Sequence, residues 1–391
     1  MNSIIKDMSL SSVTAGFLVV LISYLGPIAI FFQVGTVGNI SSEMMSSWIW
    51  AISIGSGISG IYLSWKYKSP IITAWSAPGS ALLITLVANT SMSLIVGAYL
   101  TAAVIIFLVG MTGSFDWLIQ HIPKGLAAGM LAGILFQFVL GTFNALQTRP
   151  LLAFSMIFSY LVCKKLFPRL SIVFTLFAGL VTILLLDQYQ FNNIAFELSR
   201  PIQIAPSWDL QSTLGLALPL VLVSLSGQYL PGMAILKVSG YHTPAKPIMI
   251  ATSFSSFLMA FFGGITIVSA AITAAICTTK DAHLDPDKRY IAGISSGVFF
   301  LIAGFFATSI VALFRGFPKE FVAILAGLAL LGALLSNISI MVEDHAHREA
   351  SFITFLVTAS GVNLVGVGST FWGVLIGAGA YFILKSGGSH D

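Results

Sequence analysis

The sequence predicts an all-α integral membrane protein with fourteen transmembrane segments, arranged as two inverted repeats of seven. Composition gives the first reason: 57% of the 391 residues are hydrophobic and 8% are charged, whereas charged residues make up about a quarter of a soluble domain. The second reason is that apolar stretches follow one another along the whole chain with short polar connections. The third is that short motifs of the first half return, in the same order, in the second half.

Each expected span is an apolar run bounded by turn or charge signals. A helix needs about 20 apolar residues to cross the hydrocarbon core, so roughly fourteen spans leave no room for a soluble domain. The first run is too long for a signal peptide and lacks a small-residue cleavage site, so we interpret it as the first span. The expected spans are 10–34, 46–64, 69–88, 93–112, 124–144, 149–163, 170–187, 211–237, 246–262, 264–278, 290–313, 320–340, 350–365 and 368–386.

Lysine and arginine residues are distributed unequally between the two sides of this arrangement. Of the 18 residues, four lie on the side opposite the amino terminus, namely Arg149, Arg200, Arg315 and Lys319, and the other fourteen lie on the amino-terminal side. Because Lys and Arg concentrate in cytoplasmic loops, we expect both termini in the cytoplasm. The net charge of +4 follows from this bias, and without a basic patch that carries aromatic residues we expect no nucleic-acid partner.

The two cysteines, Cys163 and Cys277, fall in or beside apolar segments and are expected to be free thiols. Neither belongs to a metal-binding pattern, so no metal ion is predicted. The sequence contains no recognisable nucleophile–base pair or phosphate-binding loop, and we therefore predict no cofactor and no catalytic residue.

Three pairs of motifs indicate an internal repeat. They fall in the first, third and fifth spans of each half. Because seven is an odd number, the second repeat enters the membrane from the opposite side, which is the inverted-repeat plan of secondary transporters. The alternative is a chance match of residues that are common in membrane helices. The pairs are "SYLGPIAI" from Ser23 with "QYLPGMAI" from Gln228, "ITAWSA" from Ile72 with "ITIVSA" from Ile265, and "IPKGLAAGMLAG" from Ile122 with "FPKEFVAILAG" from Phe317.

The third and tenth spans, 69–88 and 264–278, carry helix breakers and small polar residues at mid-membrane depth. Irregular backbone is tolerated there only inside protein or beside a cavity, so both spans are expected to be broken. The β-branched and aromatic residues before each break predict a short extended piece, followed by a half-helix. Two half-helix starts that face each other form an anion site without a cationic side chain. No ionisable residue lies in the middle of any expected span, which argues against a carboxylate-gated or sodium-coupled carrier.

Candidate substrate-binding residues lie at these breaks and in the first and eighth spans. Gln228 offers hydrogen-bond donors and acceptors at membrane depth, and Trp75 could stack on an aromatic substrate. The alternatives are that the prolines only kink their helices, that the tyrosines and the tryptophan only pack, and that Gln228 bonds to another helix. The complete set is Tyr24, Trp75, Ser76, Ala77, Pro78, Gly79, Ser80, Gln228, Tyr229, Ser269, Ala270 and Thr273.

Four motifs resemble one known family. The stretches "ITAWSAPG" in the third span, "PGMAILKVSGY" from Pro231, "AAITAAIC" from Ala270 and "FLVTASG" from Phe355 are similar to the benzoate/proton symporter family of bacterial inner-membrane proteins. The likeness runs from about Ser12 to Leu384. It implies uptake of an aromatic carboxylate, benzoate first, together with a proton by alternating access.

The resemblance also implies a uracil-permease-like fold with a core domain and a gate domain. The core domain consists of residues 1–112 and 211–313, and the gate domain of 113–187 and 314–391. Substrate would lie between the third, eighth and tenth spans. The connecting loop, 188–210, is expected on the external side, where it could cover the gate. Dimers occur among folds of this kind, so a homodimer is compatible with the resemblance.

One departure from the related nucleobase carriers concerns charge. Those carriers hold acidic residues in the eighth and tenth spans, whereas this chain has Gln228 in the eighth and only Ser, Thr and apolar residues in the tenth. An anionic substrate is therefore favoured over a nucleobase. The remaining proton-carrier candidates are Glu43, Asp116 and Asp187, all near span ends. Otherwise the proton travels with the substrate, or coupling is weak.

Two other functions fit the sequence less well. The first is a passive or exchange-type organic anion transporter or channel. The second is an intramembrane enzyme that uses the loop carrying Asp281, His283, Asp285 and Asp287. The neighbouring basic residues and Pro286 favour a solvated cytoplasmic turn instead. The histidines His345 and His347 are likewise interpreted as solvated and not as metal ligands.

Overall fold

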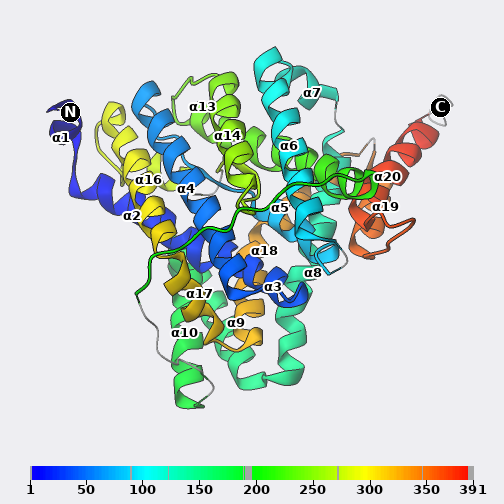
Figure 1. The fold of residues 1–391 in the computed structure, drawn as a ribbon, viewed down its shortest axis with the longest axis horizontal. Helices are drawn as coiled ribbons and strands as arrows, with labels where there is room; N and C mark the ends of the chain where they lie inside the picture. Colours follow the sequence, from blue (N-terminus) through cyan, green and yellow to red (C-terminus); the bar gives the residue numbers. More distant parts are fainter. Residues whose placement is uncertain are drawn as a thin grey trace.

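The computed structural model describes residues 2–88, 90–121, 123–187, 189, 196–270, 273–345 and 347–385, and most of them are helical (Figure 1). The first half contains α1 (Asn2–Asp7), α2 (Leu10–Leu25), α3 (Pro27–Val37), α4 (Ser42–Tyr67), β1 (Thr73–Trp75), α5 (Ala77–Leu82), η1 (Leu83–Thr85), α6 (Met92–Thr112), α7 (Phe115–His121), α8 (Lys124–Thr148), α9 (Pro150–Leu166), η2 (Pro168–Leu170) and α10 (Ser171–Leu185). The second half contains α11 (Leu210–Ser212), η3 (Thr213–Ala217), α12 (Leu218–Ser224), η4 (Leu225–Tyr229), α13 (Leu230–Val238), α14 (Ala245–Ala260), β2 (Ile267–Ser269), α15 (Ala274–Cys277), η5 (Pro286–Lys288), α16 (Tyr290–Phe305), α17 (Ala307–Arg315), α18 (Lys319–Glu343), α19 (Arg348–Ala359) and α20 (Ser369–Lys385).

Five helical stretches within the described residues are long and apolar enough to cross a membrane. A sixth candidate consists of two parts, Pro286–Phe305, which includes α16, and Ala307–Arg315, which is α17. The two parts meet at 69°. The chain is therefore a membrane protein with at least five apolar spans. The five stretches are Leu10–Val37, Met92–Thr112, Lys124–Thr148, Leu210–Val238 and Lys319–Glu343.

The first of these stretches is divided at Gly26, between α2 and α3. Pro27 has no backbone N–H and therefore suits the first position of a new helix better than the interior of a continuous one. A Cβ atom at Gly26 would lie 2.9 Å from the Cβ atom of Ala329 in α18. The glycine thus allows the divided stretch to pack closely against α18.

Two short strands pair at the point where the sequence predicts extended pieces. Strands β1 and β2 are antiparallel, with Ala74 opposite Val268 at the centre, and all six strand residues are buried. The pairing continues beyond the strands, because the N–H of Ser76 donates to Thr266 O at 2.9 Å and the N–H of Ala270 donates to Ile72 O at 2.9 Å. Non-local pairing thus satisfies backbone groups that no helix could satisfy.

Helices α4 and α14 hydrogen-bond to the strands and to the residues just before β1. The Thr73 hydroxyl donates to Ser56 O in α4 at 2.7 Å, and the N–H of Ile267 donates to Ser256 Oγ in α14 at 2.8 Å. The Ser64 hydroxyl of α4 donates to Ile71 O at 3.0 Å. The sheet can therefore remain two strands wide inside an apolar protein, because carbonyl and hydroxyl groups of the neighbouring helices form hydrogen bonds with it.

Helix contacts recur in pairs between the two halves. Helix α4 packs on α16, and α14 packs on α6. Helix α14 follows the eighth expected span, in which the motif of the first span returns. Helices α9 and α10 pack together as α19 and α20 do, while α8 packs on α18. Figure 1 shows α9 and α10 at the lower edge and α19 and α20 at the right.

Residues 196–209 run as an extended segment across the helices in Figure 1. Their backbone bonds to the ends of several helices: Ser199 N–H to Phe305 O, Ile204 N–H to Phe261 O, and Ser207 N–H to Ser93 O. The N–H of Ile202 donates to Ser47 Oγ at 2.8 Å. These partners belong to helices of the expected core domain, whereas the sequence led us to expect a loop that covers the gate.

Candidate functional site

The first half of the candidate site is a capped helix start after β1. The Ser76 hydroxyl accepts the N–H of Gly79 at 3.0 Å, and the Ser80 hydroxyl donates to Ser76 O at 2.8 Å. Pro78 lies in the first turn of α5, where its missing N–H leaves no bond unmade. Ala77 is half-buried, and the other four residues of this set are buried. The first turn therefore follows from local sequence rules alone.

The second half of the candidate site follows β2 and differs from the first. Ser269 is the last residue of β2, and a Cβ atom at Gly232 in α13 would lie 2.6 Å from its hydroxyl oxygen. Thr273 precedes α15 without a side-chain bond to the helix start. Ala270 lies between them, and residues 271–272 are outside the described residues.

The eighth expected span contains two π-helical segments, η3 and η4. Gln228 and Tyr229 both belong to η4, and π-turns inside α-helices are frequent at functional sites. The Tyr229 hydroxyl is 2.6 Å from Thr252 Oγ1, so this buried side chain ties the span to α14. Gln228 is half-buried, and its amide has no hydrogen-bond partner among the described residues. A Cβ atom at Gly227 would lie 3.0 Å from Leu131, which puts this part of the span against α8.

Trp75 lies within an aromatic cluster at the end of β1. Its ring is edge-on to Tyr24 and Phe300, each with a centroid distance of 5.8 Å, and to Phe31 at 6.3 Å. The Tyr24 hydroxyl is hydrogen-bonded to the Ser53 hydroxyl. The indole N–H of Trp75 is buried and has no partner among the described residues. The structure thus brings Tyr24 and Trp75 together, with one polar atom left unpaired.

The three proton-carrier candidates lie at helix ends and are exposed. Glu43 is in the first turn of α4, Asp116 in the first turn of α7, and Asp187 follows α10 with a φ of 49°. Hydrogen bonds from the backbone N–H of Glu43 itself and from the Ser41 hydroxyl hold the pKa of this exposed carboxyl below its ordinary value. Glu43 is therefore ionised at neutral pH.

Comparison with known proteins gives the family. The family model of benzoate membrane transport proteins matches residues 6–383. A benzoate membrane transport protein of Acinetobacter baylyi is 56% identical over 379 residues, which cover 97% of this chain and 96% of that protein. The chain belongs to the benzoate membrane transport protein family. The inner membrane protein YdcO of Escherichia coli is 36% identical over 371 residues, 95% of each chain.

The chain also shares its fold with membrane transporters of known structure. SLC26A9 matches with a TM-score of 0.62 and 13% identity, over 95% of this chain and 65% of that one. The transmembrane domain of the cyanobacterial bicarbonate transporter BicA matches with a TM-score of 0.61 and 13% identity, over 96% and 98%. At such low identity these matches concern the fold alone. A family of transport proteins also rules out the enzyme alternative.

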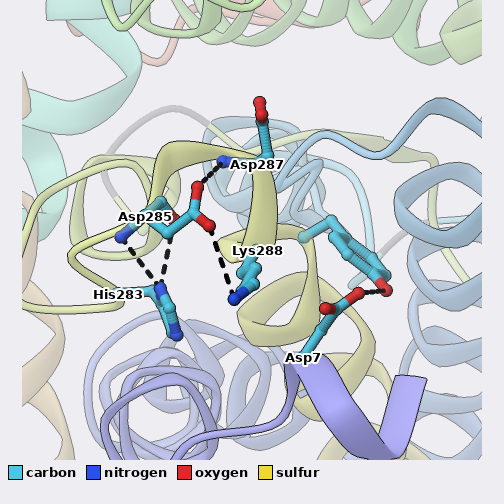
Figure 2. A network of polar contacts seen from close by, with 6 residues as sticks. Asp7, His283, Asp285, Asp287 and Lys288 are labelled. Atoms are coloured by element: carbon cyan, nitrogen blue, oxygen red, sulfur yellow. Dashed lines mark hydrogen bonds and ion pairs between the residues drawn. The ribbon is translucent and has the colours of Figure 1, made fainter. Parts of the chain in front are cut away.

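The loop proposed for that enzyme is a structured turn in this family member (Figure 2). The Asp285 carboxylate accepts the N–H of Asp287 at 3.0 Å and lies 3.5 Å from Lys288 Nζ, while His283 Nδ1 accepts the N–H of Asp285 at 3.0 Å. Arg289 donates to Thr278 O at 2.8 Å, which fixes the turn to the end of α15. The Asp285 carboxylate therefore stabilises the turn.

Sequence reasoning missed the polar stripe of α14. Thr252 and Ser256 lie four residues apart and so share one helix face, from which they bond to Tyr229 and to Ile267 of β2. The spacing within "TSFSSF" was the available signal. It needed the knowledge that an unpaired extended segment lies opposite, which only the fold supplies.

Proposed function

We propose that the protein is a secondary transporter that imports benzoate, or a closely similar aromatic carboxylate, together with a proton by alternating access. The observation that carries the proposal is the 56% identity, over nearly the whole of both chains, to a protein named for benzoate transport. The same proposal has the protein in the bacterial inner membrane with both termini in the cytoplasm, as a monomer or a homodimer. The name of the Escherichia coli relative supports the inner membrane.

We infer that the chain has fourteen spans in two inverted repeats, with the third and tenth broken. The hydrogen bonds at the strands support a two-fold relation: Ser76 N–H donates to Thr266 O and Ala270 N–H to Ile72 O. With an offset of 194 between the halves, residue 76 is equivalent to 270 and residue 72 to 266. Exchanging the two halves therefore converts each of these hydrogen bonds into the other. An in-plane two-fold axis makes equivalent segments antiparallel, as β1 and β2 are. The same axis makes α4 equivalent to α14 and α16 equivalent to α6. The contact between α4 and α16 accordingly recurs between α14 and α6.

This relation supports the two expected domains. The core would comprise 1–112 and 211–313, and the gate 113–187 and 314–391, with 188–210 as an external connection. Gly26 and Gly227 then lie on the seam, because they face Ala329 of α18 and Leu131 of α8. Movement along this seam would open the site to either side.

The substrate site in this proposal is the set of residues around the paired strands, from Ser76 to Ser80 and from Ser269 to Thr273. Helices α5 and α15 are short, so their dipoles alone supply a modest positive end. The unpaired Gln228 amide and the unpaired Trp75 indole would add donors for the carboxylate. Tyr24 and Trp75 would contact the ring, and Tyr229 would hold the eighth span in place.

Proton coupling would require a group that binds and releases the proton. Among the described residues no Asp or Glu is fully buried, and Glu43, Asp116 and Asp187 are all exposed. This observation favours a second candidate, an exchange-type or passive organic anion transporter. In the proton-coupled mechanism, one of these three carboxyls carries the proton, or the proton travels with the substrate.

Liposomes containing the purified protein distinguish the two candidates. The measurement is uptake of labelled benzoate with and without an inward proton gradient, at a fixed membrane potential. Accumulation that needs the gradient supports symport. Saturable exchange that ignores the gradient supports the second candidate, and no benzoate uptake under any condition contradicts both.

A further inference from the structure

A cavity of about 750 Å³ lies where α3, α8, α17 and α18 meet, apart from the twelve candidate substrate residues. We propose that this cavity is a docking site on the external side, which binds an aromatic carboxylate before it reaches the paired strands. The inference rests on the proposed function and adds a second site for the same substrate class.

The apolar part of the cavity suits a single benzene ring. Phe32 and Phe314 line it and stack on each other with centroids 4.4 Å apart and planes 4° apart. Phe317 lies edge-on to Phe314 at 5.7 Å, and Met45 adds a flexible thioether. Small-molecule sites typically have volumes of about 300–1,000 Å³ and are lined mostly by apolar and aromatic side chains. The cavity therefore has ample room for the ring and for water.

The polar part of the cavity carries excess positive charge. Arg315, Lys319 and Glu320 line it, but the Glu320 carboxylate is already 3.0 Å from Arg149 Nε. Arg315 donates to Ile40 O at 3.1 Å, which directs its guanidinium toward the linker after α3, and the Glu43 charge acts on it. Lys319 is exposed at the start of α18. An incoming carboxylate would thus meet the Lys319 ammonium first.

The distribution of cations along the chain supports the same conclusion. Only four of the 18 Lys and Arg residues are expected on the external side, and three of them, Arg149, Arg315 and Lys319, belong to this cavity or to the ion pair at its edge. Topology disfavours cations on that side, so their concentration at one cavity calls for a local reason. Because Glu320 is paired with Arg149 and the Glu43 charge acts on Arg315, the Lys319 charge is in excess, and a positive charge beside apolar walls raises the local concentration of an anion.

Helix α3 connects this cavity to the candidate substrate site. Phe32 lines the cavity, while the preceding residue, Phe31, is edge-on to Trp75. In the proposed domains, α3 and α17 belong to the core, and α8 and α18 to the gate. A ligand docked here is therefore at the core–gate seam, on the path that opens when the seam separates.

The test compares Lys319→Gln and Lys319→Glu with the wild-type protein in labelled-benzoate uptake, as initial rates over a range of concentrations. We expect KM to rise about two- to fivefold in Lys319→Gln, because an exposed charge contributes modestly, and to rise further in Lys319→Glu. The maximal rate should not change. The difference should disappear in about 1 M salt, where the Debye length is about 3 Å.

Lys165→Gln is the matched control, because Lys165 is exposed at the end of α9 on the expected cytoplasmic side. Its KM should equal that of the wild-type protein. An unchanged KM in both Lys319 variants overturns the docking site, and so does a lower maximal rate at unchanged KM, which would assign Lys319 to the gating movement. If the wild-type protein takes up no benzoate, the proposed function fails instead, and the two failures are thereby distinguished.

Discussion

At the scale of single residues, two unpaired polar side chains lie at the proposed substrate site. The Trp75 indole N–H is buried and the Gln228 amide is half-buried, and neither has a partner among the described residues. Buried polar atoms without a partner also occur elsewhere, for example in Trp48, Tyr99 and Thr142. What relates Trp75 and Gln228 to the proposed site is therefore their position, in β1 and in the segment η4 that contacts β2. A carboxylate supplies acceptors for both.

Replacement of Gln228 by Ala is expected to raise KM for benzoate about tenfold or more. Hydrogen bonds to charged groups contribute about 1.5–3 kcal/mol, and 1.4 kcal/mol corresponds to tenfold in affinity. Uptake into liposomes measures the effect, with Gln120→Ala, a change of an exposed glutamine in α7, as the control. Normal uptake kinetics in Gln228→Ala would remove this residue from the site.

Replacement of Trp75 by Phe tests the second unpaired group. The change removes the indole N–H and keeps an aromatic ring among Tyr24, Phe31 and Phe300. Because an unpaired buried donor costs about 1–3 kcal/mol, its loss offsets the lost packing, and Tm in detergent should change by no more than about 2 °C. KM for benzoate should rise about tenfold. A large fall in Tm with unchanged KM would make Trp75 a packing residue only.

How far the sequence predicts individual residues depends on the range of the interaction. Ser76, Pro78 and Gly79 obey local rules for helix starts, and the structure has the helix start expected there. The roles of Gln228 and Tyr229 are not local. Both lie in a π-helical segment, which has no clear sequence signal. In this segment the buried Tyr229 bonds to α14, whereas the neighbouring Gln228 has no partner among the described residues.

At the scale of elements, the paired strands depend on helix side chains for their remaining hydrogen bonds. The N–H of Ile267 donates to Ser256 Oγ at 2.8 Å, and the same hydroxyl lies 3.3 Å from Ile267 O. Within an apolar interior no water replaces these bonds, so the serine supports the strand directly.

Replacement of Ser256 by Ala should therefore lower the free energy of unfolding by about 1–3 kcal/mol, because it leaves the N–H of Ile267 buried and unpaired. For a chain of this length the change corresponds to a fall in Tm of about 1–4 °C. The control is Ser253→Ala on the same helix, since the Ser253 hydroxyl bonds only to carbonyl oxygens of its own helix. Equal Tm values for the two variants would contradict this role of Ser256.

The sequence predicts the presence of these elements better than it predicts which residues of the two halves are equivalent. β-Branched and aromatic residues indicated both extended pieces, and strands are present there. The motif pair suggested an offset of 193, from Ile72 to Ile265, whereas the hydrogen bonds exchange at 194. With an offset of 194, the residue of the second half that is equivalent to Ser76 is Ala270. Only the first half-helix therefore has a serine cap. The extended course of 196–209 had no periodic signal, because each of its bonds goes to a different distant helix.

At the scale of the whole molecule, the proposed mechanism requires the core and the gate to move relative to each other. Gly26 and Ala329 meet across the expected seam, with 2.9 Å between the Cβ positions, and Gly110 and Met249 meet within the expected core at the same 2.9 Å. Bonded cysteines have Cβ atoms about 3.5–4.5 Å apart, so either pair can form a disulfide after a shift of about 1 Å. The two pairs therefore have the same distance between their Cβ positions and differ in their place relative to the seam.

We expect the disulfide of Gly26→Cys with Ala329→Cys to abolish benzoate uptake, and its reduction to restore uptake, because a covalent bond across the seam prevents the two domains from separating. The disulfide of Gly110→Cys with Met249→Cys should leave uptake unchanged. Both pairs require a background in which Cys163 and Cys277 are replaced. Oxidised and reduced samples of one preparation are compared, so any effect of the substitutions themselves cancels. Full uptake in the oxidised seam variant would mean that α2, α3 and α18 move as one body, and the domain boundary would then lie elsewhere in the fold.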